Sequence, residues 1–332
     1  MKRKIVGVLF FALPLLLFCV TARAQKLGLL MDSYVVDRWY LDQKLFCDKV
    51  RELGAECLVE VAYGDPAEQI RLTRKLISEG VKIIIVVAVD ATKAAEIVSI
   101  AKQANVKVMA YDRLIVHPDL AMYVSYNNEK VGALQAKYAM QKHPTGNYVL
   151  LNGPISDNNA IMFREAQLKE LQPAVDKGTI KIMADLVMQD WGEIGALLQM
   201  DEFYSTSNTL PNVIIAANDA LASGAIQALP PGTNSSIIIT GQDADLGAIK
   251  NIIAGTQSMT IYKPIKPLAH MAAETAVKLV KNEAITNFVP VKYQGQTVNS
   301  ILLDPIIVDK SNFKDTVIKD GHVSLSEMDI KK

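Results

Sequence analysis

Side chains that can recognise hydroxyl groups follow the end of one apolar run after another in this sequence. They are Asp32, Asp90, Asp112, Arg113, Asn152, Asp157, Asn158, Asn159, Asn218, Asp219, Gln242 and Asp243. Ligands of open α/β sheets bind beyond the carboxyl ends of the strands, so we expect these groups to share one rim. Carboxylates, amides and a guanidinium suit a ligand made of hydroxyl groups, each of which donates and accepts hydrogen bonds. The other interpretation of any single Asp or Asn is that it caps the following helix.

The sequence has two tryptophans, Trp39 and Trp191, and both stand among polar residues. Trp39 follows Arg38 shortly after the first apolar run, and Trp191 lies in a polar loop. Neither belongs to an apolar run, so core packing is not the first explanation for them, although it stays open. An aromatic face packs well against the C–H face of a sugar ring. We therefore expect both tryptophans at a binding site.

Residue patterns typical of enzymes and metal sites are missing from the sequence. The four histidines are scattered without the spacing of metal ligands. There is no G-x-S-x-G, Walker A or H-E-x-x-H motif, and no G-x-G-x-x-G after the first apolar run. Segment 309–313 begins like a calcium loop, but it has Phe313 at the fifth position and lacks the following glycine. The sequence predicts no catalytic residue, no metal and no cofactor.

Short apolar runs alternate with amphipathic stretches along the chain, as in βα units around parallel sheets. The best-marked helix covers residues 66–78, with Asp65 as N-cap, Pro66 at the first helical position, Glu68 completing a capping box and Gly80 as the stop. The predicted strands are 26–31, 57–62, 83–87, 106–111, 122–126, 148–151, 213–216, 237–240 and 259–262.

These elements are too many for one ordinary open sheet. The predicted fold class is α/β, with two doubly wound parallel-sheet lobes joined by a hinge of several strands. The N-terminal lobe is predicted to comprise residues 25–126 plus about 261–290, including a returning helix at 265–281. The C-terminal lobe is predicted to comprise residues 127–260 plus about 291–332.

Residues 1–24 have the pattern of a cleaved signal peptide. A basic segment at 2–4 precedes an apolar run that ends at Val20, and residues 22–24 read Ala-Arg-Ala, a small-x-small cleavage pattern. The run is too short to span a bilayer. We expect export to the periplasm, and the alternative is a lipoprotein anchored at Cys19.

The charge balance excludes an obvious nucleic-acid partner. The chain carries 35 basic and 35 acidic residues, and loss of residues 1–24 would remove four of the basic ones. Proteins that bind nucleic acids show a basic excess or a basic stripe instead. A mildly acidic exported protein is the expected product.

Two cysteines, Cys47 and Cys57, lie beyond the predicted cleavage site. An oxidising compartment would allow them to form a disulfide. Cys47 falls in a helical pattern and Cys57 at the start of a strand, where small buried apolar residues are common. We therefore predict that both are buried free thiols.

Longer motifs of this chain resemble those of the periplasmic D-xylose-binding proteins, within the type I sugar-binding proteins of ABC importers. The resemblance covers nearly all of the chain after residue 24. It departs from the family pattern at Asp32-Ser33, where an acidic pair is usual, and at 88–92, where a Tyr-Asn type of loop is usual. The matching motifs are DRW at 37–39, AYDR at 110–113, NEKVG at 128–132, DNNA at 157–160, NDA at 218–220, GAIQAL at 224–229, GQDADL at 241–246, AGTQ at 254–257, YKPI at 262–265 and KDTVIKDG at 314–321.

The resemblance implies a ligand, a partner and a set of binding residues. The ligand would be a monosaccharide, D-xylose before others, and the partner the membrane permease of an ABC importer. Trp39 and Trp191 would sandwich the sugar ring. The charged binding residues would make charge-assisted hydrogen bonds, which are stronger than neutral ones. Bonds to the sugar oxygens are implied for Arg38, Asp112, Arg113, Asp157, Asn159, Asn218, Asp243 and Lys263.

Other functions share features with this interpretation. A sensor subunit that reports to a membrane histidine kinase or chemoreceptor would have the same pocket, and another pentose or a hexose could be the ligand. A sugar-processing enzyme would need a carboxylate pair, and the candidates Asp112 and Asp157 look committed to hydrogen bonds. A repressor would need a DNA-binding headpiece, for which the sequence offers no segment. We expect a monomer.

Overall fold

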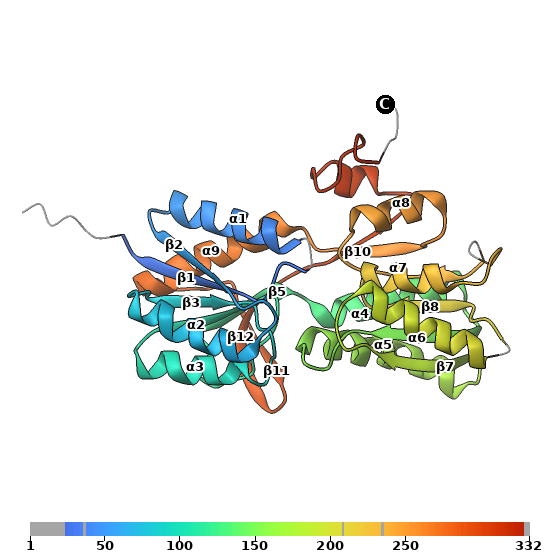
Figure 1. Cartoon of the computed structure of the whole chain (residues 1–332), viewed down its shortest axis with the longest axis horizontal. Helices are drawn as coiled ribbons and strands as arrows, with labels where there is room; N and C mark the ends of the chain where they lie inside the picture. The colour runs from blue at the N-terminus through green and yellow to red at the C-terminus, as the bar shows by residue number, and fades with distance from the viewer. Residues whose placement is uncertain (1–23, 36–37, 208, 234–235, 329–332) are drawn as a thin grey trace, which may run out of the picture.

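The computed structural model describes residues 24–35, 38–207, 209–233 and 236–328. These residues form two α/β lobes that lie side by side (Figure 1). Residues 1–23 of the predicted signal peptide, with Cys19, lie outside the described residues, as does Asp37 of the DRW motif. In the described part of the chain, no helix is long and apolar enough to cross a membrane.

The first lobe is built on a seven-stranded sheet in the order β11-β12-β5-β4-β3-β1-β2. Neighbouring strands are parallel except in the β11–β12 hairpin, which is antiparallel. The strands are β1 (Lys26–Met31), β2 (Glu56–Val61), β3 (Ile83–Val86), β4 (Lys107–Tyr111), β5 (Met122–Tyr126), β11 (Val289–Tyr293) and β12 (Gln296–Leu303).

Helices cover both faces of this sheet. In Figure 1, α1 (Arg38–Glu52) and α9 (Ile265–Lys281) lie above it, and α2 (Pro66–Ser78) and α3 (Ala94–Gln103) lie below. Alternate residues of β3 pack into separate hydrophobic clusters on the two faces. The unbroken apolar sequence of β3 follows from this arrangement, because both faces of the strand are dry.

The second lobe has a parallel sheet in the order β7-β6-β8-β9, and an antiparallel pair, β10–β13, beside it. Its helices cover both faces too, since alternate residues of β6 pack into two different clusters. The strands are β6 (Gly146–Asn152), β7 (Ile180–Val187), β8 (Val213–Ala216), β9 (Ile238–Ile239), β10 (Met259–Tyr262) and β13 (Ile306–Asp309). The helices are α4 (Asn128–Lys142), α5 (Asn158–Asp176), α6 (Glu193–Thr206), α7 (Asp219–Ala228) and α8 (Leu246–Ala254).

Three described segments cross between the lobes, after β5, β10 and β12. β5 and β12 are paired up to their ends, and the Asn127 amide donates to the Leu303 carbonyl over 2.8 Å. The Tyr126 hydroxyl donates to the Pro264 carbonyl over 2.7 Å, which joins the third segment to the first. The crossings are therefore tied together, and a rotation of one lobe against the other would turn about them.

The structure corrects one predicted boundary. Residues 291–303 were expected in the C-terminal lobe, but β12 pairs with β5 and the β11–β12 hairpin extends the first sheet. Residues 306–309 do lie in the second lobe, where β13 pairs with β10. The hairpin is an edge element whose first strand is mostly exposed, so it lacks the apolar signal that marks the inner strands.

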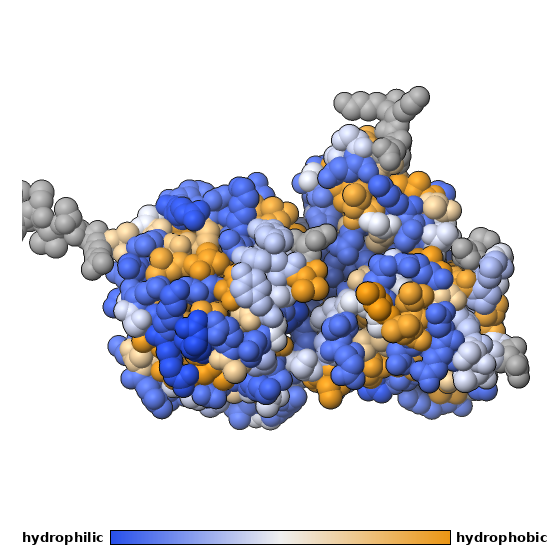
Figure 2. Space-filling model, in the orientation of Figure 1, coloured by the Kyte–Doolittle hydropathy of each residue, from blue (hydrophilic) through white to orange (hydrophobic). Residues whose placement is uncertain are grey.

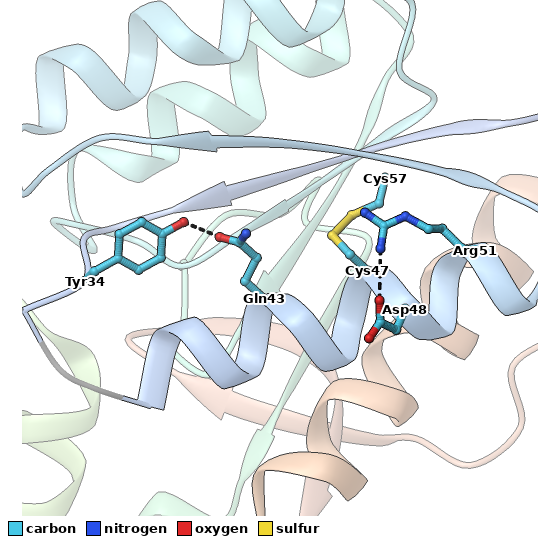
Figure 3. The surroundings of a disulfide bond; sticks show 6 residues. All are labelled: Tyr34, Gln43, Cys47, Asp48, Arg51 and Cys57. Atoms are coloured by element: carbon cyan, nitrogen blue, oxygen red, sulfur yellow. Dashed lines mark hydrogen bonds and ion pairs between the residues drawn. A yellow bond between two sulfur atoms is a disulfide. The ribbon is translucent and has the colours of Figure 1, made fainter.

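A second correction concerns the cysteines, which were predicted to be free thiols. Cys47 and Cys57 form a disulfide, with their Cα atoms 5.4 Å apart (Figure 3). Cys57 lies on the face of β2 against which α1 packs, and Cys47 is buried on the facing side of α1. The sequence placed Cys47 in a helix and Cys57 in a strand correctly. Only the packing of α1 on β2 brings the two sulfur atoms together.

Loss of this disulfide should lower the stability of the folded chain. The bond closes a loop between positions ten residues apart, and the loss of unfolded-state entropy from such a loop is worth about 3 kcal/mol. We expect the free energy of unfolding of the Cys47→Ala/Cys57→Ala variant to fall by about that amount, with a correspondingly lower urea midpoint, and reduced wild-type protein to match it. Equal unfolding midpoints for oxidised and reduced wild-type protein would contradict the disulfide.

Candidate binding site

A cavity of about 360 Å³, including the part open to solvent, lies between the two lobes. The lobe boundary is visible in Figure 2 as a groove bordered largely by hydrophilic residues. The lining includes all ten residues expected to bind the ligand, together with Phe163 and Gln242. They are Arg38, Trp39, Asp112, Arg113, Asp157, Asn159, Phe163, Trp191, Asn218, Gln242, Asp243 and Lys263.

The lining residues stand just beyond the carboxyl ends of strands in both sheets. Arg38 and Trp39 open α1, which follows β1, and Asp112 follows β4 directly. From the second lobe, Asn159 stands in the first turn of α5 after β6, and Lys263 follows β10. This is the place at which open α/β sheets bind ligands, and here two such edges face each other.

A buried network of opposite charges fills one side of the cavity. The Arg38 guanidinium makes two 3.1 Å bonds to the Asp42 carboxylate and lies 3.4 Å from Asp112 and 3.6 Å from Asp243. The Lys263 ammonium lies 3.8 Å from Asp112 and 3.7 Å from Asp243. Two cations and two carboxylates thus stand at distances longer than a direct hydrogen bond, and oxygen atoms of a ligand could complete their coordination.

Arg113 links the lobes on the other side of the cavity. Its Nη1 donates to Asp32 over 2.8 Å and to the Ala88 carbonyl over 2.9 Å, both within the first lobe. Its Nε lies 2.9 Å from the Asp157 carboxylate of the second lobe. Asp157 also accepts a 3.1 Å hydrogen bond from the indole N–H of Trp191. One guanidinium therefore orients an acid and an aromatic wall of the opposite lobe.

Asp112 is held rigidly and keeps one oxygen available. Its backbone adopts φ 60°, and its carbonyl accepts 2.8 Å bonds from the hydroxyls of Tyr123 and Ser125. Its Oδ1 accepts from the Asn159 amide over 3.1 Å. Among the described residues, its buried Oδ2 has no hydrogen-bond partner, and the same holds for Gln242 Oε1. Buried polar atoms are costly to leave unpaired, so these two acceptors in the lining call for donors on a ligand.

The two acids that receive bonds across the cavity have opposite pKa shifts. Burial by itself would raise the pKa of Asp112, but the nearby Lys263, Arg38 and Arg113 hold it below its ordinary value. Burial raises the pKa of Asp157, and the Arg113 guanidinium only partly offsets this. Asp112 is thus the acid kept firmly as a carboxylate, which accepts hydrogen bonds and donates none.

Each tryptophan is held by a different environment. Trp39 is 3% exposed and belongs to the core cluster of the first lobe, with the Arg38 guanidinium 4.7 Å from its ring centre. Trp191 is half-buried, and its ring meets Phe163 edge-on at 6.2 Å. A Cβ on Gly153 would lie 2.3 Å from the Trp191 ring, so the ring can occupy this position only because residue 153 is a glycine. Trp39 is therefore both a core residue and part of the cavity wall, whereas the main place of Trp191 is in the cavity wall.

Capping and lining are combined in two residues. Asp157 caps α5 by accepting from the Asn159 amide over 2.9 Å, and Asn218 caps α7 by accepting from the Leu221 amide over 2.9 Å. Both also line the cavity. Asp90, by contrast, accepts from two amides in the turn before α3 and does not line it. Capping thus accounts fully for some strand-end acids and only in part for others.

Two residues of the site, Phe163 and Asp42, were missed from the sequence although spacing could have found them. Phe163 lies four residues after Asn159, so both face the same side of α5. Asp42 has the same spacing from Arg38 on α1 and anchors it. Gln242, which the sequence placed on the rim, lines the cavity beside Asp243. In the part of the chain that the structure describes, no group of three or more His, Cys, Asp and Glu side chains is placed to hold a metal ion.

Two α/β lobes with a polar cavity between them define a solute-binding protein. The chain belongs to the periplasmic binding protein domain family, which it matches over residues 27–284. This confirms the predicted fold class and family. Among solved structures, a carbohydrate transporter solute-binding protein of Chloroflexus aurantiacus in complex with D-glucose is 27% identical, with a TM-score of 0.84 over 92% of this chain and 98% of that one.

Curated relatives are more similar in sequence. The chain is 42% identical to the D-xylose-binding periplasmic protein of Haemophilus influenzae, over 89% of this chain and 90% of the relative. It is also 42% identical to the protein of the same name from Escherichia coli, over 95% and 96% of the two chains. These relatives confirm the prediction of a binding protein rather than an enzyme, and they are periplasmic, in line with the expected location.

Gly153→Ala should displace the Trp191 ring, because the new methyl group would occupy its place. In a Trp39→Phe background, where Trp191 is the remaining tryptophan, we expect a longer emission wavelength and stronger quenching by acrylamide. Overpacking of this kind also costs about 1–3 kcal/mol of stability. Gly247→Ala is the matched control, since a Cβ there meets no atom within 4 Å. Unchanged emission and quenching in Gly153→Ala would show that the ring does not lie on Gly153.

Proposed function

We propose that this protein captures a monosaccharide, D-xylose in preference to others, in the cavity between its lobes and delivers it to an ABC importer. The observation that carries the proposal is the rigid, ionised Asp112, whose Oδ2 faces Arg38 and Lys263 at 3.4 and 3.8 Å without a hydrogen bond. A sugar hydroxyl can donate to this oxygen and accept from a cation at the same time. The D-xylose-binding relatives support the choice of sugar.

Recognition divides between polar groups and rings. Asp112, Asp243, Arg38 and Lys263 offer charge-assisted bonds to hydroxyls on one side of the cavity. Further donors and acceptors on the other sides come from Arg113, Asp157, Asn159 and Asn218. Trp39 and Trp191, which line the same cavity, supply apolar faces for the C–H groups of the sugar ring.

Binding would draw the lobes together. The proposed contacts come from both lobes, so the sugar makes its full set only when the lobes are closed around it. A ligand that binds one arrangement better shifts the equilibrium toward that arrangement. The crossings joined by Tyr126, Asn127, Pro264 and Leu303 are the natural axis of this movement.

The proposed role in transport sets the location and the partner. Residues 1–24 would direct export and be cleaved, and the mature protein would act in the periplasm as a monomer. Its partner would be the membrane permease of the importer. The periplasmic relatives support this location.

A calorimetric panel of D-xylose, D-ribose, L-arabinose, D-glucose, D-galactose and D-allose tests the proposal. We expect D-xylose to bind with Kd of about 1 μM or tighter, which corresponds to about −8 kcal/mol. A sugar that lacks one matched hydroxyl should bind far more weakly, because buried polar groups are left unpaired. A hexose or D-ribose that outranked D-xylose would contradict the assigned sugar.

The same calorimetric titration, repeated on two variants, tests whether the sugar binds in the cavity. Asp112→Asn keeps the shape of the side chain but removes its charge, and should weaken D-xylose binding about 100-fold or more. Asp90→Asn is the control, because Asp90 caps a turn outside the cavity. Equal affinities in the two variants would place the sugar elsewhere.

A further inference from the structure

A second set of polar contacts joins the lobes outside the cavity. The Asn158 side chain, on the first turn of α5, is 5% exposed. Its Nδ2 donates to the carbonyl of Leu114 over 2.9 Å, and its Oδ1 accepts from the hydroxyl of Tyr293 over 3.3 Å. Leu114 and Tyr293 both belong to the first lobe, and none of the three residues lines the cavity. One amide of the second lobe thus spans two elements of the first.

Apolar and backbone contacts surround this amide. Met162 lies four residues after Asn158 on α5, is 6% exposed, and packs in the hydrophobic cluster of the first lobe that contains Leu114. The amide of Ala91 in the first lobe donates to the carbonyl of Ser156 over 2.9 Å. The start of α5 is therefore an interface between the lobes as well as a border of the cavity.

The helix itself does not need the Asn158 side chain. Asp157 already caps α5, and Asn159 bonds to Asp112 in the cavity. The three consecutive polar residues thus have different roles: Asp157 caps the helix, Asn159 bonds in the cavity, and both bonds of the Asn158 side chain go to the other lobe. The crossings join the lobes through the backbone at the hinge, whereas Asn158 joins them through side-chain hydrogen bonds away from it.

We propose that Asn158, with Tyr293 and the Leu114 carbonyl, is a closure latch that sets how tightly and how long the sugar is held without touching it. The inference rests on the proposed function and adds a positioning residue to it. Contacts made only in the closed arrangement favour that arrangement, and a ligand that needs it gains affinity by the same factor. Loss of the latch would act on opening, and so on the rate at which the sugar leaves.

The test compares Asn158→Ala and Tyr293→Phe with wild-type protein, with D-xylose as the ligand. We expect Kd to rise about 10-fold in Asn158→Ala and about 3-fold in Tyr293→Phe. A faster dissociation rate should account for both increases. The double variant should equal Asn158→Ala, since the partner of the Tyr293 hydroxyl is then already absent. Tyr204→Phe is the control, because among the described residues its buried hydroxyl has no hydrogen-bond partner.

Other readouts separate a latch from a merely structural residue. A latch leaves the melting temperature of the sugar-free protein nearly unchanged, whereas a structural role lowers it and leaves Kd alone. Wild-type Kd and dissociation rate in Asn158→Ala, together with a wild-type radius of gyration in the sugar-free protein, would overturn the latch. If Asn158→Ala does not fold, Tyr293→Phe decides by the same criteria.

Failure of the proposed function would look different. Wild-type protein would then bind none of the six sugars, and the latch would be judged on sugar-free protein by small-angle scattering. A larger radius of gyration in Asn158→Ala than in wild-type protein would support it, and equal radii would overturn it.

Discussion

The arrangement of this protein depends on keeping a carboxylate charged where water is nearly excluded. Asp112 is buried, and burial alone would favour its neutral form. Lys263, Arg38 and Arg113 reverse that preference, and they must be brought within a few ångströms of it to do so. Removal of one partner from such a buried pair leaves an uncompensated charge, which is strongly destabilising. The positions of the cations are therefore as constrained as that of the acid.

This electrostatic constraint requires two sheets that face each other. Asp112 follows β4 of the first lobe, whereas Lys263 follows β10 and Asn159 stands on α5 of the second. Arg38 is fixed by Asp42 one turn along α1, and α1 is joined to β2 by the disulfide at Cys47. Each cavity group thus has its own support behind it, and the cavity is preorganised for a polar ligand.

The sequence predicted those parts of the structure that obey local rules. The bounds of α2 were predicted from capping, and many of the polar cavity residues from the rule that ligands meet the carboxyl ends of strands. Arg38 and Lys263 were expected only because the chain resembles the D-xylose-binding proteins. Features made by distant contacts were harder. The Cys47–Cys57 bond depends on how a helix packs on a strand, and β11 is a mostly exposed edge strand without the continuous apolar run of the inner strands. The bonds of Asn158 need the two lobes to be placed first.

The central claim, that D-xylose binds between the lobes, can be tested through the two tryptophans, since both line the cavity. The measurement is intrinsic fluorescence during a D-xylose titration of wild-type protein and of the Trp39→Phe and Trp191→Phe variants. Sugar between the rings changes the surroundings of both indoles, so we predict a saturable change in each of the three proteins, with the wild-type midpoint equal to the calorimetric Kd. Calorimetric binding without any fluorescence change in the three proteins would contradict the account.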